Sequence, residues 1–344
     1  MTMKQLLAGL AALLVLPSAA AAAGSTPPVP DSWQSAINAA HPLVGRLVRV
    51  RDGARVAPET LAGAASEATY VLLGETHDNP DHHALQAWIV RAMTARGRRP
   101  AVAFEMIDAD QGRDLRRYLD GAPGDAGGLG DAVGWRARGW PAWEIYRPIG
   151  EAALAHDLPM WPADVARKLQ KQVGRHGFDG AVDAERRARL ALDRPLGNTL
   201  RSNLMAELKA GHCNMLPESA LAPMARVQRL RDAVMADNLM AAAKDSADGA
   251  VLIAGRGHAR ADRGVPWYLR ARLDAPSVLT VGIVEAMAGQ TEWRSYLPQA
   301  PEAGPAPFDY IWITPRFDDT DHCAEMRKRM EKMRQSHGAG NDGN

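Results

Sequence analysis

Tyr70-Val71-Leu72-Leu73-Gly74-Glu75-Thr76-His77 is a short apolar run that ends in Gly-x-x-His. The chain repeats this pattern at Ala250-Val251-Leu252-Ile253-Ala254-Gly255-Arg256-Gly257-His258. Both runs are continuous and apolar, which is typical of strands buried on both faces of a parallel sheet. If the two strands are parallel neighbours, His77 and His258 lie together at the carboxyl edge of the sheet, where open α/β folds bind ligands.

The segments around these runs alternate between strand and helix patterns. Apolar residues at three- and four-residue steps predict a helix over Pro80–Arg96. Short apolar runs predict further strands at Ala101–Phe104, which ends on Glu105, and at Pro159–Pro162, Val278–Glu285 and Tyr310–Thr314. This order predicts an α/β fold with a mainly parallel central sheet flanked by helices.

Most of the chain between the two Gly-x-x-His strands has a helical pattern. Asp164 is expected to open a helix, and residues 165–216 and 221–243 continue as charged and amphipathic helical segments. We therefore expect a helical insertion between the two strands, packed on the α/β core. The glycine-rich segment Gly121–Gly134 predicts a loop.

The two ends of the chain predict its domain organisation. Residues 1–23 combine Lys4, an apolar stretch and a small-residue run, the order found in signal peptides, although an uncleaved anchor is the alternative. We expect a flexible lead-in over 24–40, a single domain over 41–320 and a basic, mobile tail over 321–344. The mature protein is then secreted or periplasmic without a transmembrane span, and no cysteine near the cleavage region provides a lipid anchor.

Composition excludes several classes of function. The net charge of +1 with scattered Lys and Arg gives no general attraction for nucleic acid. The motifs of serine hydrolases, P-loop and Rossmann nucleotide-binding proteins, zincins and c-type haem proteins are absent from the sequence. Of two cysteines, Cys213 and Cys323, neither has the close Cys partner that a structural zinc site needs, and a disulfide and two free thiols both stay open.

Acidic and imidazole groups gather where the strands are expected to end. Glu75, His77, Glu105 and His258 follow strands directly, and His83 lies in the first turn of the next helix. Imidazole nitrogens and carboxylate oxygens in this arrangement hold a divalent metal or orient a substrate. The alternative is a buried polar network that locks the strand ends.

Tyr146 is a second kind of candidate. Its phenol offers an oxygen ligand for ferric iron, Trp143 and Trp140 offer an aromatic wall for a flat macrocycle, and Arg147 offers a cation for carboxylates. On spacing alone, an aromatic anchor in the core is the favoured interpretation of Tyr146.

Several sequence blocks resemble the ChaN-like haem-binding protein family. The blocks run in order through most of the mature chain: Gly74-Glu75-Thr76-His77-Asp78-Asn79-Pro80, Phe104-Glu105-Met106, Tyr146-Arg147-Pro148, Gly211-His212-Cys213, Arg231-Asp232-Ala233, Gly255-Arg256-Gly257-His258 and Arg263-Gly264-Val265-Pro266. The resemblance implies an α/β fold that binds haem in bacterial iron or haem uptake, with a tyrosine as the iron ligand. Tyr146 is the position that corresponds to it.

The resemblance leads to two functional hypotheses. The first is an exported, non-enzymatic haem-binding protein that works with haem-uptake components and forms a homodimer around haem; Tyr146 ligates the iron, and the pocket comprises Trp143, Arg147, His77, His83 and His258. The second follows from the wider superfamily of erythromycin esterases, TraB and Tiki proteins. It is a divalent-metal-dependent hydrolase whose catalytic residues are Glu75, His77, Glu105 and His258.

Overall fold

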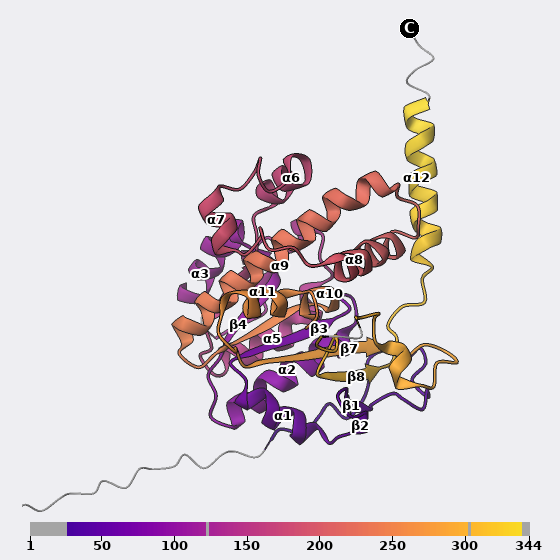
Figure 1. The fold of residues 1–344 in the computed structure, drawn as a ribbon. Helices are drawn as coiled ribbons and strands as arrows, with labels where there is room; N and C mark the ends of the chain where they lie inside the picture. Colours follow the sequence, from indigo (N-terminus) through magenta and orange to yellow (C-terminus); the bar gives the residue numbers. More distant parts are fainter. Residues whose placement is uncertain (1–25, 122–123, 302–303, 339–344) are drawn as a thin grey trace, which may run out of the picture.

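The apolar runs expected as strands form the middle of an eight-stranded sheet with helices on both faces (Figure 1). The structure is a computed structural model, and it describes residues 26–121, 124–301 and 304–338. The expected signal peptide, 1–23, lies outside the described residues.

The sheet has the strand order β2-β1-β8-β7-β3-β6-β4-β5. The strands from β8 to β5 are parallel, whereas β1 and β2 add an antiparallel edge beside β8. Their bounds are β1 (Leu47–Arg49), β2 (Ala54–Arg55), β3 (Tyr70–Glu75), β4 (Ala101–Asp108), β5 (Met160–Asp164), β6 (Ala250–Gly255), β7 (Val278–Glu285) and β8 (Tyr310–Thr314).

The two Gly-x-x-His strands, β3 and β6, are parallel neighbours, as the sequence predicts. Gly74 pairs with Ala254 and Glu75 with Gly255, so the strands end at the same level. This register carries the two histidine-bearing loops to one edge of the sheet, although 180 residues separate Tyr70 from Ala250 along the chain.

Helices cover both faces of the sheet (Figure 1). Val71 and Leu73 of β3 pack in the core layer that includes α1, α2 and α5, and Leu72 packs in the layer that includes α9 and α11. Burial on both faces explains why the strands are apolar throughout and do not alternate. The helices are α1 (Pro58–Glu67), α2 (Pro80–Ala95), η1 (Ala109–Gln111), α3 (Gly112–Gly121), α4 (Leu129–Ala132), η2 (Arg136–Arg138), α5 (Trp143–Leu154), α6 (Arg167–His176), α7 (Ala184–Arg189), α8 (Asn198–Gly211), α9 (Glu218–Ser246), α10 (Arg256–Ala259), α11 (Val265–Arg272), η3 (Trp293–Tyr296) and α12 (His322–Gly338).

Some element boundaries differ from the sequence prediction. Strand β4 continues through Glu105 to Asp108, and Asp164 ends β5 instead of opening a helix. The side chains of Glu105 and Asp164 are ion-paired with Arg231, and this pairing compensates the burial of their charges inside the strands. The short helix α4 lies in the segment expected as a loop, and the β1–β2 hairpin was not predicted because strands of 3 and 2 residues show no periodicity.

Specific contacts hold residues 34–35, near the start of the described chain, and Cys323, at the start of α12, to the body of the protein. The backbone amides of Gln34 and Ser35, in the expected lead-in, donate to the Asp81 carboxylate at 2.8 and 2.9 Å. Cys213 and Cys323 form a disulfide, which resolves the open question of their pairing and ties the start of α12 to the α8–α9 connection. Beyond the disulfide, α12 projects away from the body (Figure 1). Within the described ranges, no helix has the length and apolar character needed to span a bilayer.

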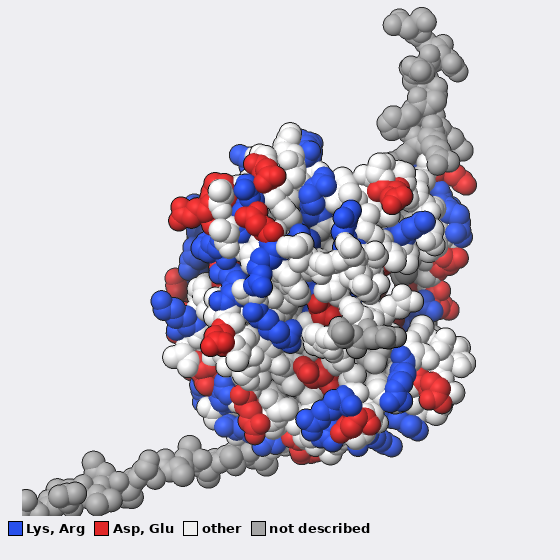
Figure 2. Space-filling model, in the orientation of Figure 1, with Lys and Arg blue, Asp and Glu red and all other residues white. Residues whose placement is uncertain are grey.

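The surface carries both signs of charge. Figure 2 shows Lys and Arg interspersed with Asp and Glu over the face in view. This agrees with the near-zero net charge of the chain.

Candidate functional site

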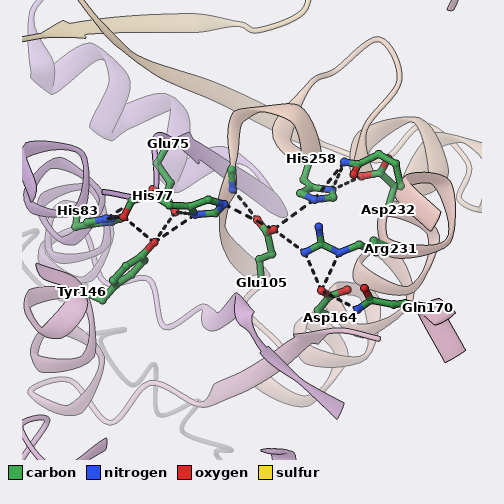
Figure 3. A network of polar contacts seen from close by, with 12 residues as sticks. Glu75, His77, His83, Glu105, Tyr146, Asp164, Gln170, Arg231, Asp232 and His258 are labelled. Atoms are coloured by element: carbon green, nitrogen blue, oxygen red, sulfur yellow. Dashed lines mark hydrogen bonds and ion pairs between the residues drawn. The ribbon is translucent and has the colours of Figure 1, made fainter. Parts of the chain in front are cut away.

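A connected polar network lies at the carboxyl ends of four adjacent strands, β3, β6, β4 and β5 (Figure 3). Glu75 is the last residue of β3, Asp164 is the last residue of β5, and Glu105 lies in β4. His258 comes from α10, which begins directly after β6. The parallel topology therefore gathers side chains from four separate parts of the sequence.

Glycines permit the close approach of these segments. A Cβ atom on Gly74 would lie 2.9 Å from the Ala259 Cβ and 3.0 Å from the Arg256 Cα. A Cβ atom on Gly255 would lie 3.1 Å from the His77 Nε2. The glycine of each Gly-x-x-His motif is thus required where α10 and the His77 ring pack on the strand ends.

The first half of the network centres on Glu75 and Tyr146 (Figure 3). His77 Nδ1 lies 2.8 Å from Glu75 Oε1, and the Tyr146 hydroxyl lies 3.1 Å from the same oxygen and 3.1 Å from the His77 carbonyl oxygen. The His83 ring stacks on the Tyr146 ring with centroids 3.7 Å apart, and its Nε2 lies 3.0 Å from the His77 carbonyl oxygen.

The second half centres on Glu105. Its Oε1 accepts from Arg231 Nη2 at 2.7 Å and lies 3.3 Å from His258 Nε2. The other ring nitrogen of His258 lies 2.6 Å from Asp232 Oδ1, and Arg231 also donates to Asp164 at 2.7 Å. Glu105 joins the two halves, because His77 Nε2 lies 3.9 Å from its Oε1.

The carboxylates of the network keep the histidines of both Gly-x-x-His motifs protonated. Burial opposes the charge on His77, but Glu75 and Glu105 outweigh it and raise the pKa of His77 to about 9. Burial likewise opposes the charge on His258, but Glu105 and Asp232 raise its pKa to about 9. Burial acts to raise the pKa of Glu105. The positive charges of His258, Arg231 and His77 outweigh burial and hold the pKa of this carboxyl well below its usual range. Imidazolium and carboxylate groups therefore coexist at neutral pH.

Access to the network differs between its members. The His77 side chain is 33% exposed and packs beside Trp140 with ring centroids 5.0 Å apart, whereas Tyr146 is fully buried. Burial, followed by the charges of Glu75 and Glu105, raises the pKa of Tyr146 well above its ordinary value, so the phenol keeps its proton in this arrangement. Glu75 Oε2 is buried and has no hydrogen-bond partner among the described residues.

The remaining predicted pocket residues occupy different environments. Trp143 is buried, donates its indole N–H to the Ala126 carbonyl oxygen at 2.7 Å and packs edge-on against Trp135. Arg147 is half-exposed and pairs with Glu151 at 2.8 Å on the same helix, α5. Trp143 therefore supports the site from within the core, whereas Arg147 lies on the surface of α5 and forms no hydrogen bond or ion pair with the described members of the network.

Sequence reasoning missed part of the network. Asp164 was predicted to open a helix, and Arg231 and Asp232 were indicated only as a pair that could face the site or bind each other. Gln228 was part of the same sequence block, and its Nε2 lies 3.1 Å from His258 Nδ1. Asp232 follows Arg231 on a long helix, and nothing in the local pattern shows that both side chains face the strand ends. The adjacent Arg-Asp pair was the one available signal.

The network is poorly suited to a divalent cation. Glu105 uses Oε1 for Arg231 and Oε2 for the Gly255 amide, and the guanidinium would repel a metal ion at the same oxygen. Among the residues that the structure describes, three His, Cys, Asp or Glu ligand atoms converge within 4.8 Å only at Asp78, Asp318 and His322, outside this network.

Comparison with known proteins identifies relatives of this architecture. A family model described as haem-binding uptake, Tiki superfamily, ChaN matches residues 61–269. Among solved structures, ChaN of Campylobacter jejuni, which shows cofacial haem binding, superposes with a TM-score of 0.59 at 18% identity, covering 77% of this chain and 95% of that one.

Two further solved structures match more loosely. The type III effector HopBA1 has a TM-score of 0.40 at 15% identity, covering 80% of this chain and 99% of the effector. A mutant of the erythromycin esterase EreC in its open conformation has a TM-score of 0.36 at 13% identity, covering 66% and 72%. These two superpositions are too loose to support an argument about this chain. None of the curated proteins matches the sequence significantly.

Proposed function

The chain belongs to the ChaN family of haem-binding uptake proteins in the Tiki superfamily, and on that premise we propose that it binds haem at the rim formed by His77 and Tyr146. The observation that carries this proposal is the phenol of Tyr146 beneath the partly exposed His77, with the Glu75 carboxylate contacting both. Phenolate and imidazole are both ligands of haem iron in proteins.

We propose Tyr146 as the iron ligand in preference to His77. The Glu75 and Glu105 carboxylates keep His77 protonated at neutral pH, and an imidazolium has no free lone pair for iron. Ferric iron supplies the positive charge that stabilises a phenolate, which reverses the preference of Tyr146 for its proton. Glu75 is placed 3.1 Å from the hydroxyl to receive that proton.

The fit of Tyr146 requires one local rearrangement. Its hydroxyl is enclosed here by Glu75 and by the side chain and carbonyl of His77, so the His77 side chain must turn outward to give access. His77 has room to do so because a third of its side chain is exposed. Turned outward, the imidazolium and Arg147 supply cations for the haem propionates.

We extend the proposal to cellular context on weaker support. The disulfide between Cys213 and Cys323 is typical of oxidising compartments and supports an exported protein that takes part in haem or iron uptake. Cofacial haem binding in ChaN of Campylobacter jejuni supports a homodimer that shares haem across the exposed His77 rim.

Metal-dependent hydrolysis has less support as the alternative. A general base must be unprotonated, but the pKa of His77 and of His258 is raised to about 9, so both are cations at neutral pH. Of the two remaining candidates, Glu105 is held by Arg231 and the Gly255 amide, and Glu75 Oε1 is in contact with His77 and with the Tyr146 hydroxyl.

A hemin titration tests the haem proposal. We expect the wild-type protein to shift the Soret band of hemin at stoichiometric amounts, and Tyr146→Phe to weaken binding by about tenfold or more, because the mutant lacks the ligand oxygen. His77→Ala should keep the Soret shift, because it opens access to Tyr146 and removes only one of the two cations proposed for the propionates.

The matched control is Tyr118→Phe, which removes a phenol on α3 outside the network. Unchanged titration by Tyr146→Phe together with loss of binding in His77→Ala would transfer the ligand role to His77. The absence of any Soret shift with the wild-type protein would contradict haem binding itself.

A further inference from the structure

A cavity of about 780 Å³ lies next to the polar network but is not part of it. It opens between α8, α10, the end of β7 and the segment around Leu297 (Figure 1). A volume of this size accommodates a small organic ligand.

Arg256, the second residue of the Gly-Arg-Gly-His motif, lines this cavity. Its guanidinium is partly buried and has no hydrogen bond or ion pair with any of the described residues. Burial lowers the pKa of Arg256, although the more distant carboxylates of Glu285, Glu207 and Glu75 oppose this effect. A partly buried guanidinium without a partner among the described residues can donate to a bound anion, and such a charge-assisted hydrogen bond would stabilise the complex.

The other charged groups of the cavity leave one positive charge in excess. Arg260 is neutralised by Asp262 at 2.6 Å, and Glu207 is neutralised by Arg263, which donates to it. Arg256 and Arg316 then face Glu285, whose carboxylate accepts only from amide groups among the described residues. This balance favours a ligand with a single negative charge.

The rest of the lining is largely apolar. Phe308 and Leu297 contribute carbon surface inside the cavity. Met287 lies beside them and is 44% exposed, so an apolar side chain extends the lining to the solvent. A ligand that fills this space needs an apolar part as well as an anionic head.

We propose that the cavity binds a small amphipathic carboxylate, with its carboxylate on Arg256 and its apolar part against Phe308, Leu297 and Met287. This site does not depend on haem binding at Tyr146. The two natural sources of such a carboxylate are a short fatty acid and the propionate edge of haem itself.

Equilibrium dialysis of the purified protein with radiolabelled decanoate tests the proposal. We expect Arg256→Met to weaken decanoate binding by about tenfold or more, the loss typical of a charge-assisted hydrogen bond. The matched control, Arg175→Met, removes an exposed arginine of α6 and should bind like the wild type. Decanol, which has the same chain without the charge, should bind the wild type at least about tenfold more weakly than decanoate.

A second variant leaves Arg256 intact. Ala206 is exposed on α8 and lines the cavity, so Ala206→Trp should fill the space and block decanoate without disturbing the core. Failure of the wild type to retain decanoate, or equal binding by Arg256→Met, would overturn the proposal.

Hemin added to the decanoate complex identifies the source of the carboxylate. Displacement of decanoate by stoichiometric hemin would assign Arg256 to the haem propionates. Retention of decanoate alongside hemin would assign the cavity to a separate fatty carboxylate.

Discussion

At the residue scale, the network depends on one shared carboxylate. Glu105 Oε1 lies within 4 Å of Arg231, His258 and His77, so a single buried oxygen serves three cations. Removing it would leave uncompensated positive charge in the core, which is among the most destabilising changes in a folded protein.

The raised pKa of His258 predicts how stability depends on pH. Because the folded-state pKa is about 9 and the ordinary value is 6.5, its stabilisation is complete below pH 6.5 and is lost as the pH rises to about 9. We expect the free energy of unfolding to fall by roughly 1–3 kcal/mol over this interval. Urea unfolding at pH 6.5 and pH 9 measures it.

His258→Gln should reduce this dependence, and His77, whose pKa is also raised to about 9, accounts for the rest. The control His176→Gln, at an exposed position of α6, should leave it unchanged. A wild-type unfolding free energy that stays constant from pH 6.5 to pH 9 would show that the histidines are neutral in the folded protein.

The sequence indicated the members of the network that follow strands better than those on α9. Glu75, His77, Glu105 and His258 were identified because each follows a strand pattern and the parallel topology brings strand ends together. Asp164 was not, and Arg231 and Asp232 were indicated only as a pair, because the directions in which side chains point from α9 are set by packing against the sheet. In the structure Arg231 donates to Asp164, and Asp232 contacts His258. Spacing alone favoured a buried position for Tyr146, which the structure confirms, but nothing in the sequence placed it beneath His77.

At the element scale, the close contact between β3 and α10 requires glycine in the first motif. Gly74→Ala would place a Cβ atom 3.0 Å from the Arg256 backbone, so we expect the protein to lose about 1–3 kcal/mol of stability, as overpacked sites do. Thermal unfolding followed by circular dichroism measures the loss.

Gly63→Ala is the matched control for this substitution. Gly63 lies within α1, and a Cβ atom there meets nothing within 4 Å. Alanine should therefore stabilise the protein by about 0.5–1 kcal/mol through its higher helix propensity. Equal stability of Gly74→Ala and the wild type would mean that β3 and α10 are packed less closely than described.

The long elements were predictable because periodicity and burial agree over many residues. Strands β7 and β8 match the predicted ranges, and α2 differs by one residue at its end. The edge hairpin β1–β2 and the single-turn helix α4 were not predictable, because elements of so few residues are stabilised by tertiary contacts rather than by local pattern.

At the scale of the whole molecule, the fold places two distinct chemistries on one rim. The Tyr146–His77 side offers a phenol and imidazole beneath a partly exposed surface, and the Arg256 side offers a cavity with an unpaired guanidinium among the described residues. Gly255, at the end of β6, packs against the His77 ring, and the next residue, Arg256, lines the cavity. The two sites are therefore adjacent along the chain.

The identity of the iron ligand is tested most directly by resonance Raman spectroscopy of the ferric haem complex, excited in the phenolate-to-iron charge-transfer band. We expect phenolate vibrational modes in the wild-type complex, their persistence in Tyr118→Phe and their loss in Tyr146→Phe. A wild-type complex without phenolate modes, or modes that persist in Tyr146→Phe, would contradict haem ligation by Tyr146.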